Sequence, residues 1–262
     1  MALFTAFRTL VATVGLGLLL AGCAPTMTYQ LRPVSGDVAQ IDGRTVTKAT
    51  SSDSLVIVAS YEREDLQYIA LDIEVKNHTG QPLEVDPARF STLALDADQQ
   101  PLPDPTTAQS SDQHKAADPD REAKQVITDR VQEEKRLKRA RILNTVLMVA
   151  AVVGDISSSG RPQRYEKFVA NRIAFDGAYQ LIQAKRIVDR TTFVDRIQRL
   201  DYEAYRWDQL AMKRTTLQPG ESVRGFVYLP KAPKAAFLQL RYPTSETDNG
   251  AILFEQTTGR KR

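Results

Sequence analysis

A long helical pattern lies between two segments that have the pattern of β-strands, and few folds accommodate this order. Residues 23–100 and 205–262 consist of short apolar or alternating runs with turn signals between them, as the strands of an antiparallel sheet do. Residues 118–204 are more charged and have helical spacing. The 262 residues suffice for one large domain or two modest ones. We therefore predict an α+β fold in which a helical insertion separates two parts of one β unit.

The apolar residues of the flanking segments place individual strands. Residues 55–60 form a continuous apolar run, which is typical of a strand buried on both faces. Residues 66–75 alternate between apolar and polar side chains, which predicts a strand with one buried face. Further strands are expected at 90–95, 222–229, 236–242 and 252–254, with turns at 42–43, 77–80, 217–221 and 248–250. Short strands with turns between them favour an antiparallel β-sandwich.

Two strand–turn segments also resemble a known group of proteins. They are residues 73–82 (IEVKNHTGQP) and 216–227 (TLQPGESVRGFV), which are similar to segments of small immunoglobulin-like lipoproteins of bacterial envelopes. The resemblance implies an immunoglobulin-like β-sandwich, and no catalytic residues are carried over because such modules generally have none. The usual compact sandwich has nothing like residues 118–204, so we expect a sandwich interrupted by a long helical insertion.

The N-terminus has the order of a secretory signal. Arg8 precedes an apolar run at 10–20, and small residues follow it. A run of about 11 residues at ~1.5 Å each is too short to cross a hydrocarbon core of ~30 Å. The run ends in Leu20-Ala21-Gly22-Cys23, which resembles the lipobox of bacterial lipoproteins. The resemblance implies that residues 1–22 are a cleaved signal peptide and that Cys23 carries the lipid.

Cys23 is the only cysteine of the chain. An intramolecular disulfide and a cysteine-based zinc site are therefore excluded. Several acyl chains on Cys23 would anchor the protein without any spanning helix. Ala24 follows the cysteine, and by resemblance to sorted Gram-negative lipoproteins this residue favours the outer membrane. We expect a lipid-anchored protein of the cell envelope that faces the periplasm.

The approach to the helical insertion is marked by prolines. Residues 101–117 have the composition of a linker, and the prolines at 101, 103 and 105 would interrupt any strand ladder. Asp118 and Pro119 are then typical of an N-cap followed by proline at the first helical position. We therefore expect the insertion to begin at residue 118.

The end of the insertion is less sharply marked. Glycines and serines at 154–160 predict a break in the helix. Apolar residues spaced by three, four and seven predict further helix from about residue 165. Alternation around Tyr205 predicts a return to β structure at 205–212, so the second part of the β unit is taken as 205–262.

A basic run and an apolar run adjoin in the insertion. The basic residues are Lys135, Arg136, Lys138, Arg139 and Arg141. They predict either a solvated helical face opposed by acidic neighbours, or contact with anionic lipid, or a partner or oligomer interface. Residues 142–153, which include Val146 and Leu147, would span ~18 Å as a helix, too little to cross a bilayer.

The apolar run has two possible outcomes in the fold. By default we expect residues 142–153 to pack against Phe168, Phe175 and Ile182, which gives a helical hairpin with the Ser/Gly loop at its tip. If the helices leave the run uncovered, an exposed patch of that size implies a partner. An envelope protein and a second copy of the chain are both candidates.

The sequence contains no recognisable catalytic motif. A net charge of +3 does not indicate nucleic-acid binding. We find no nucleophile elbow, P-loop, dinucleotide-binding glycine pattern or zinc motif, so we expect no cofactor and no metal. The sequence favours a non-catalytic binding, scaffolding or assembly role, with the helical insertion as the interaction surface. The alternative is a periplasmic hydrolase with an unrecognised carboxylate pair in the insertion.

Overall fold

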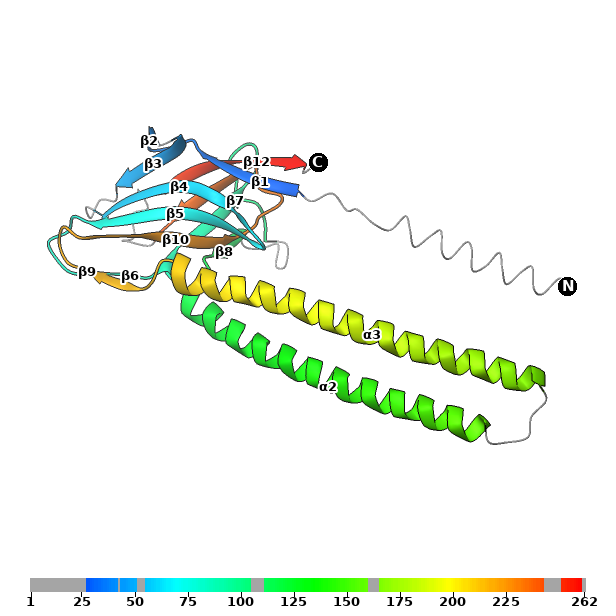
Figure 1. Ribbon diagram of the computed structural model, residues 1–262. Helices are drawn as coiled ribbons and strands as arrows, with labels where there is room; N and C mark the ends of the chain where they lie inside the picture. Colours follow the sequence, from blue (N-terminus) through cyan, green and yellow to red (C-terminus); the bar gives the residue numbers. More distant parts are fainter. Residues whose placement is uncertain are drawn as a thin grey trace.

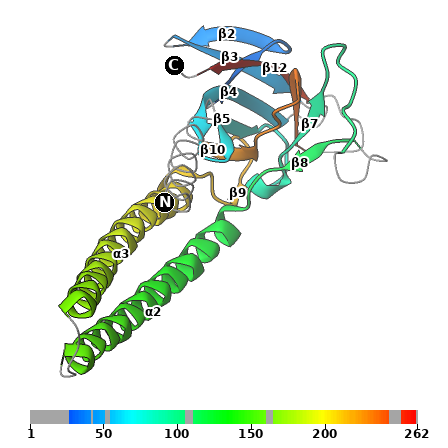
Figure 2. The same ribbon diagram turned by 90° about the vertical axis from the view of Figure 1, so that its right-hand side faces the viewer.

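The computed structural model describes residues 27–41, 43–50, 55–104, 111–159, 165–242 and 251–260. The fold is α+β, and its paired strands are antiparallel. The strands form one body, which we call the β body, and two long helices project from it side by side (Figure 1). A view turned by 90° shows that the two helices contact the β body at one end (Figure 2).

The β body contains two five-stranded sheets. The first has the order β1 (Met27–Pro33), β12 (Ile252–Arg260), β11 (Phe237–Arg241), β7 (Ser91–Leu95), β8 (Gln113–Lys115). The second has the order β10 (Ser222–Pro230), β5 (Tyr68–Asn77), β4 (Leu55–Asp65), β3 (Arg44–Thr50), β2 (Asp37–Ile41). A short pair joins β6 (Leu83–Val85) to β9 (Thr215–Leu217), and a 3-10 turn covers Pro87–Arg89. Both large sheets combine strands from before and after the helices.

The two large sheets share one hydrophobic core. Ile69, Leu71 and Ile73 of β5 are fully buried in it. Phe90 and Phe254, from the side of the first sheet, belong to the same cluster and are also fully buried. Burying each such side chain contributes about 1.5–3 kcal/mol. The β body is therefore held together by apolar contacts between the sheets, with no disulfide available.

Several strands lie where the sequence predicts them. β4 begins at the continuous apolar run and continues to Asp65, and β7 and β10 match the expected positions. The turn after β5 is closed by Asn77, whose side-chain oxygen accepts from the Thr79 amide at 3.0 Å. Gly220 has a φ of 86° in the turn before β10, a conformation that favours glycine. The hairpin turn expected at 248–250 lies outside the described residues.

The prediction of a half-buried β5 was wrong. Its alternate residues are buried as well, because the second face of the strand is covered. Ala70 packs there in a second cluster with Val126 and Leu200 of the two helices. Asp72, also on that face, is covered by Arg224, which donates to both carboxylate oxygens at 2.9 and 2.6 Å. These residues are therefore shielded from solvent, Ala70 by the two helices and Asp72 by its ion pair with Arg224.

The region expected to be a linker is partly structured. Within it, β8 pairs with β7, with Ser91 opposite Lys115. Isolated bridges join Leu95 to Pro101 and Pro103 to Ser111. The prolines precede β8, so they remove no hydrogen bond from its ladder. This segment extends the first sheet up to the start of the helices.

The two helices form an antiparallel hairpin, which we call the hairpin. They are α2 (Pro119–Ser159) and α3 (Tyr165–Tyr205), each of 41 residues. Each helix is therefore ~60 Å long at 1.5 Å per residue. Asp118 caps α2 as expected, because its carboxylate accepts from the Asp120 amide at 3.0 Å. Among the described residues, neither helix contains a stretch long and apolar enough to cross a membrane.

Two expected helix boundaries were wrong. α2 continues past Gly154 to Ser159. A Cβ atom at 154 would lie 2.9 Å from a ring carbon of Phe175, so the residue is glycine because the two helices pack closely there. Glycine there permits close helix packing and does not end the helix. At the other end, residues 206–210 form a π-helical turn that continues α3, and strand resumes only at β9. Arg206 and Trp207 are both buried in this turn, which the alternating pattern did not distinguish from a strand.

Candidate interaction surface on the helical hairpin

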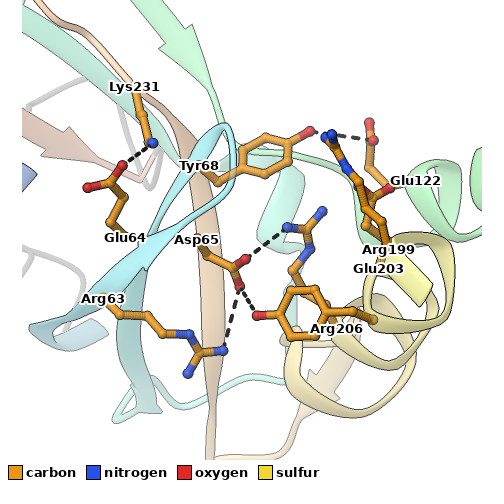
Figure 3. Close-up of polar contacts among 10 residues, drawn as sticks. Arg63, Glu64, Asp65, Tyr68, Glu122, Arg199, Glu203, Arg206 and Lys231 are labelled. Atoms are coloured by element: carbon orange, nitrogen blue, oxygen red, sulfur yellow. Dashed lines mark hydrogen bonds and ion pairs between the residues drawn. The ribbon is translucent and has the colours of Figure 1, made fainter. Parts of the chain in front are cut away.

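The hairpin is fixed to the β body by a buried ion pair. Arg206, at the end of α3, donates to the Asp65 carboxylate at 3.2 Å, and both side chains are at most 2% exposed. Tyr202, one turn earlier, donates to the other Asp65 oxygen at 2.7 Å. Figure 3 shows Arg63 approaching the same carboxylate from β4, with its nitrogen 3.6 Å away. We call these four residues the base network.

Aromatic rings surround the buried guanidinium. The Arg206 carbon lies 4.4 Å from the Trp207 ring centroid and 5.2 and 5.5 Å from those of Tyr68 and Tyr228. Tyr68 also donates to Glu122 in the first turns of α2, at 3.4 Å. Cation–π contacts of this kind are worth about 2 kcal/mol when desolvated. Both helices are therefore attached to β4 and β5 at the base of the hairpin.

Tyr228 has an unusual environment in this cluster. Its hydroxyl is buried and has no hydrogen-bond partner among the described residues. Burial, and secondarily the negative charge of Asp65, raise the pKa of Tyr228 above its ordinary value of 10.0. The folded protein therefore holds this phenol neutral at a pH where the unfolded chain would ionise it.

We expect Tyr228→Phe to keep the stability of the protein at pH 7, because the hydroxyl removed has no partner. Since the folded-state pKa is raised, the stabilisation from this phenol is full below about pH 10 and decreases as the pH rises above it. The variant should therefore lose less stability than the wild type between pH 9 and pH 11, in chemical denaturation. The control Tyr202→Phe should lose stability already at pH 7, and equal pH dependence in Tyr228→Phe and the wild type would contradict the account.

The contact between α2 and α3 consists largely of small and polar residues. Ala140, Asn144 and Ala151 lie on the α3-facing side of α2 at intervals of four and seven residues, and they are less exposed than their neighbours. The Asn144 amide donates to Asp189 of α3 at 2.9 Å. Arg196 of α3 donates to both oxygens of Glu133 at 3.0 Å. Polar partners therefore hold much of this contact in register.

Asp189 is the acceptor at the centre of this contact. Hydrogen bonds, first from Lys185 and then from Asn144, hold the pKa of Asp189 below its ordinary value. Lys185 lies one turn earlier on α3, with its nitrogen 2.6 Å from the carboxylate. The carboxylate is therefore charged at neutral pH and joins the two helices through Asn144.

The side of α2 facing away from α3 is apolar over the half distant from the β body. Two residues turn an α-helix by ~200°, so positions two away from the α3-facing residues lie on the opposite side. We call the residues of this side the outer stripe. They are Ile142, Val146, Val149 and Val153, which are 58%, 59%, 56% and 58% exposed. The expectation that residues 142–153 would be covered within the hairpin was therefore wrong for these side chains.

Apolar residues also lie exposed beside the outer stripe and on α3. Leu143 and Leu147 on α2 are exposed, as are Leu181 and Val188 on α3. Phe175 contacts α2 at Gly154, whereas the side chain of Phe168 is not described. Exposed apolar residues grouped on one element are characteristic of binding surfaces. The two helices therefore leave much of the apolar run at 142–153 exposed, which is the case for which the sequence predicts a partner.

The basic run does not form one patch. Consecutive helical positions are ~100° apart, so the run is spread around α2. Lys135, Lys138, Arg139 and Arg141 are exposed and have no ion pair with any described residue. A guanidinium nitrogen of Arg136 lies 3.7 Å from the carboxylate of Glu133, an acidic neighbour on α2. These residues form a positively charged collar between the outer stripe and the base of the hairpin.

A hollow of about 490 Å³ lies on the outer face of the second sheet. Its lining includes Arg44, Glu74 and the ion pair between Asp72 and Arg224. Arg44 itself pairs with Glu62. Each charged side chain that lines the hollow is therefore close to one of opposite sign. In the described part of the chain, no group of acidic, histidine or cysteine side chains could hold a metal ion.

Comparison with known proteins gives no relative for this chain. No family model, curated protein or solved structure matches it.

The residues that attach the hairpin were not identified from the sequence. Asp65 and Arg206 are 141 positions apart, and no local pattern distinguishes either from a surface charge. The one signal was the crowding of Tyr202, Tyr205 and Trp207 around Arg206, since aromatic side chains are often the cover of a buried cation. Of the predicted site residues, Cys23 lies outside the described residues.

Proposed function

We propose that the protein is a lipid-anchored envelope protein with a non-catalytic binding or assembly role, and that the hairpin is its interaction surface. The outer stripe is the observation that carries this proposal. Four aliphatic side chains, each more than half exposed, lie on one side of α2. Water contact with so much apolar surface is unfavourable, and binding a partner relieves it.

The anchor is proposed on Cys23, from the lipobox resemblance. Residues 24–26 separate this cysteine from β1, so the chain from Cys23 to Met27 can reach at most ~14 Å. A lipid on Cys23 would therefore hold the β body close to the membrane. The first residues of β1 lie at the end of the β body toward which the hairpin extends (Figure 1). Ala24 supports a location at the outer membrane, facing the periplasm.

We further propose that the β body, whose strands lie within residues 27–115 and 215–260, is an immunoglobulin-like sandwich. The two antiparallel sheets with a shared core support this. In this arrangement the helical insertion leaves and re-enters the β body at one place, at the base network. The β body then serves as a rigid support that sets the direction of the hairpin.

The proposed surface comprises the collar and part of the apolar run. Its residues are Lys135, Arg136, Lys138, Arg139, Arg141, Val146 and Leu147. Apolar burial would supply most of the binding energy, and the exposed cations would favour partners with complementary charge.

Crosslinking in intact cells tests the proposal. A photoreactive residue at Val146 should give an adduct, because this position is proposed to touch the partner. The same residue at Thr145, which is exposed but about 100° away around the helix, is the matched control and should give little. Failure to capture anything from Val146 in the envelope would contradict an interaction role for the hairpin.

A further inference from the structure

A groove between the two helices of the hairpin is lined by three arginines. It has a volume of about 390 Å³ and lies beside the hydrogen bond between Asn144 and Asp189. We call it the arginine groove. Its polar lining consists of Arg141, Asn144 and Thr145 of α2, and Arg186, Asp189 and Arg190 of α3. None of the four residues of the outer stripe lines it, so the two surfaces are separate.

The three arginines are not neutralised by the fold. Nearer the base of the hairpin, Arg130 of α2 is paired with Asp201 of α3. Arg141, Arg186 and Arg190 have no such ion pair with any described residue. Positions 186 and 190 are one turn apart on α3, and like charges at this spacing are destabilising. Arg186 is also partly buried, which makes an uncompensated charge more costly. An anion in the groove would relieve both effects.

The carboxylate that lines the groove is already occupied by other partners. Asp189 accepts hydrogen bonds from Lys185 at 2.6 Å and from Asn144 at 2.9 Å. Its negative charge is therefore balanced by Lys185 and not by the arginines. The arginine groove consequently has a net positive charge, which its own side chains do not compensate.

Asn144 adds a buried acceptor to the wall of the groove. The residue is 2% exposed, and its Oδ1 has no hydrogen-bond partner among the described residues. The amide cannot be reversed, because its nitrogen donates to the Asp189 carboxylate and a reversed amide would place two acceptors together. A buried acceptor without a donor is unfavourable. A ligand that brings a donor hydrogen would satisfy it.

These two requirements together select a class of ligand. Guanidinium groups bind the oxygens of carboxylates and phosphates. An ionised carboxylate has no hydrogen to donate to Asn144. A phosphate group that retains one hydrogen has both the negative charge and the donor. Sulfate has the same tetrahedral shape, but near neutral pH it carries no hydrogen.

We propose that the arginine groove binds a phosphate group that retains a hydrogen. The three guanidinium groups bind its charged oxygens, and its hydroxyl donates to Asn144 Oδ1. Free phosphate and the headgroup of a phosphomonoester lipid both carry such a group. The inference goes beyond the proposed function and does not depend on it, because no residue of the outer stripe takes part. Its failure would leave the proposed partner contact of the hairpin unaffected.

Isothermal titration calorimetry of the full-length lipidated chain in mild detergent tests the proposal, with inorganic phosphate as the probe and sulfate as its matched control. The titrations are made at pH 6, where phosphomonoesters, with a second pKa of about 6, also retain the hydrogen on about half of the molecules. Phosphate should bind at least about tenfold more tightly than sulfate, because sulfate leaves Asn144 without a donor. Equal affinities, or no binding of either anion, would overturn the proposal.

Two double variants of equal charge test the position of the site. Arg186→Gln/Arg190→Gln should weaken phosphate binding at least about tenfold, since it removes two of the three guanidinium groups. Arg121→Gln/Lys124→Gln is the control. These exposed cations of α2 are at least 17 residues from Arg141, or ~25 Å, which is beyond the screening length of salt. The control should therefore bind phosphate as the wild type does.

Equal weakening in both double variants would show that net charge alone attracts the anion, and it would contradict the proposed site. Helical circular dichroism should be the same in both, because the arginines replaced on α3 have no partner in the hairpin. The comparison of phosphate with sulfate uses the wild type, so it decides the proposal even where a variant fails to fold.

Three further probes in the same assay identify the source of the phosphate group. Glycerol 3-phosphate is a soluble phosphomonoester, and dioctanoyl phosphatidic acid is its lipid counterpart. Tighter binding of the lipid would assign the groove to a membrane headgroup, and equal affinity would assign it to a soluble phosphate. Dioctanoyl phosphatidylglycerol is a phosphodiester whose phosphate has no hydrogen, and it should bind no better than sulfate. Binding of this diester as tight as that of phosphatidic acid would contradict the role of Asn144.

Discussion

Replacing Asp65 with alanine is expected to lower the free energy of unfolding by about 3–5 kcal/mol, because the variant leaves a buried guanidinium without its counter-charge. Arg206 is only 1% exposed at its side chain and cannot reach water. Tyr202 loses its acceptor in the same variant. The loss should be visible in chemical denaturation followed by circular dichroism.

A matched control separates burial from charge. Arg130 of α2 and Asp201 of α3 also form an ion pair, with 2.6 Å between nitrogen and oxygen, but it joins the two helices to each other and its side chains are 45% and 51% exposed. Asp201→Ala should therefore cost at most about 1 kcal/mol, as exposed pairs do. The double variant Asp65→Leu/Arg206→Met should recover much of the loss, since it removes both charges together. Equal costs for Asp65→Ala and Asp201→Ala would show that the base network does not attach the hairpin.

Replacing Cys23 with serine is expected to release the protein from the membrane completely. The thiol is the proposed lipid attachment, and no described helix could substitute by spanning the bilayer. Several acyl chains on Cys23, at ~0.8 kcal/mol per buried CH₂, would account for a stable anchor. The measurement is fractionation of cells together with metabolic labelling by palmitate: wild type labelled and in the membrane fraction, variant unlabelled and soluble.

The β body supplies the control for this experiment. Since Cys23 lies before β1, the variant should retain the circular dichroism and thermal unfolding of the body. A variant that is still labelled, or a wild type that carries no label, would show that the N-terminus is not a lipoprotein signal. The hairpin proposal would then have to be considered for a protein free of the membrane.

Local pattern predicted the elements but not their contacts. The period-two alternation of Ile69, Leu71 and Ile73 identified β5, because a strand with one face on the core requires that period. The same pattern was misleading about Ala70, whose burial depends on two helices more than 50 residues away. Asp118 and Pro119 marked the start of α2, since capping is a local interaction.

The candidate surface was only partly predictable for the same reason. The run at 142–153 was recognisably apolar, but whether Phe175 and its neighbours cover it depends on how the helices pack. Small residues such as Gly154, together with polar contacts such as Asn144–Asp189, occupy the inner side, so Val146 is left outside. The base network depends on contacts between distant segments, which no window of sequence contains.

The central claim is that the outward side of the hairpin, and not the β body, contacts the partner. The most direct test is the yield of crosslinked product from photoreactive residues at Val146 and Thr145, compared with one at Gln40 on the exposed strand β2. We predict a yield from Val146 at least about tenfold above the other two, since Val146 is 59% exposed in the isolated chain and proposed to be covered in the envelope. Equal yields from the three positions, or a product from β2 alone, would contradict the account.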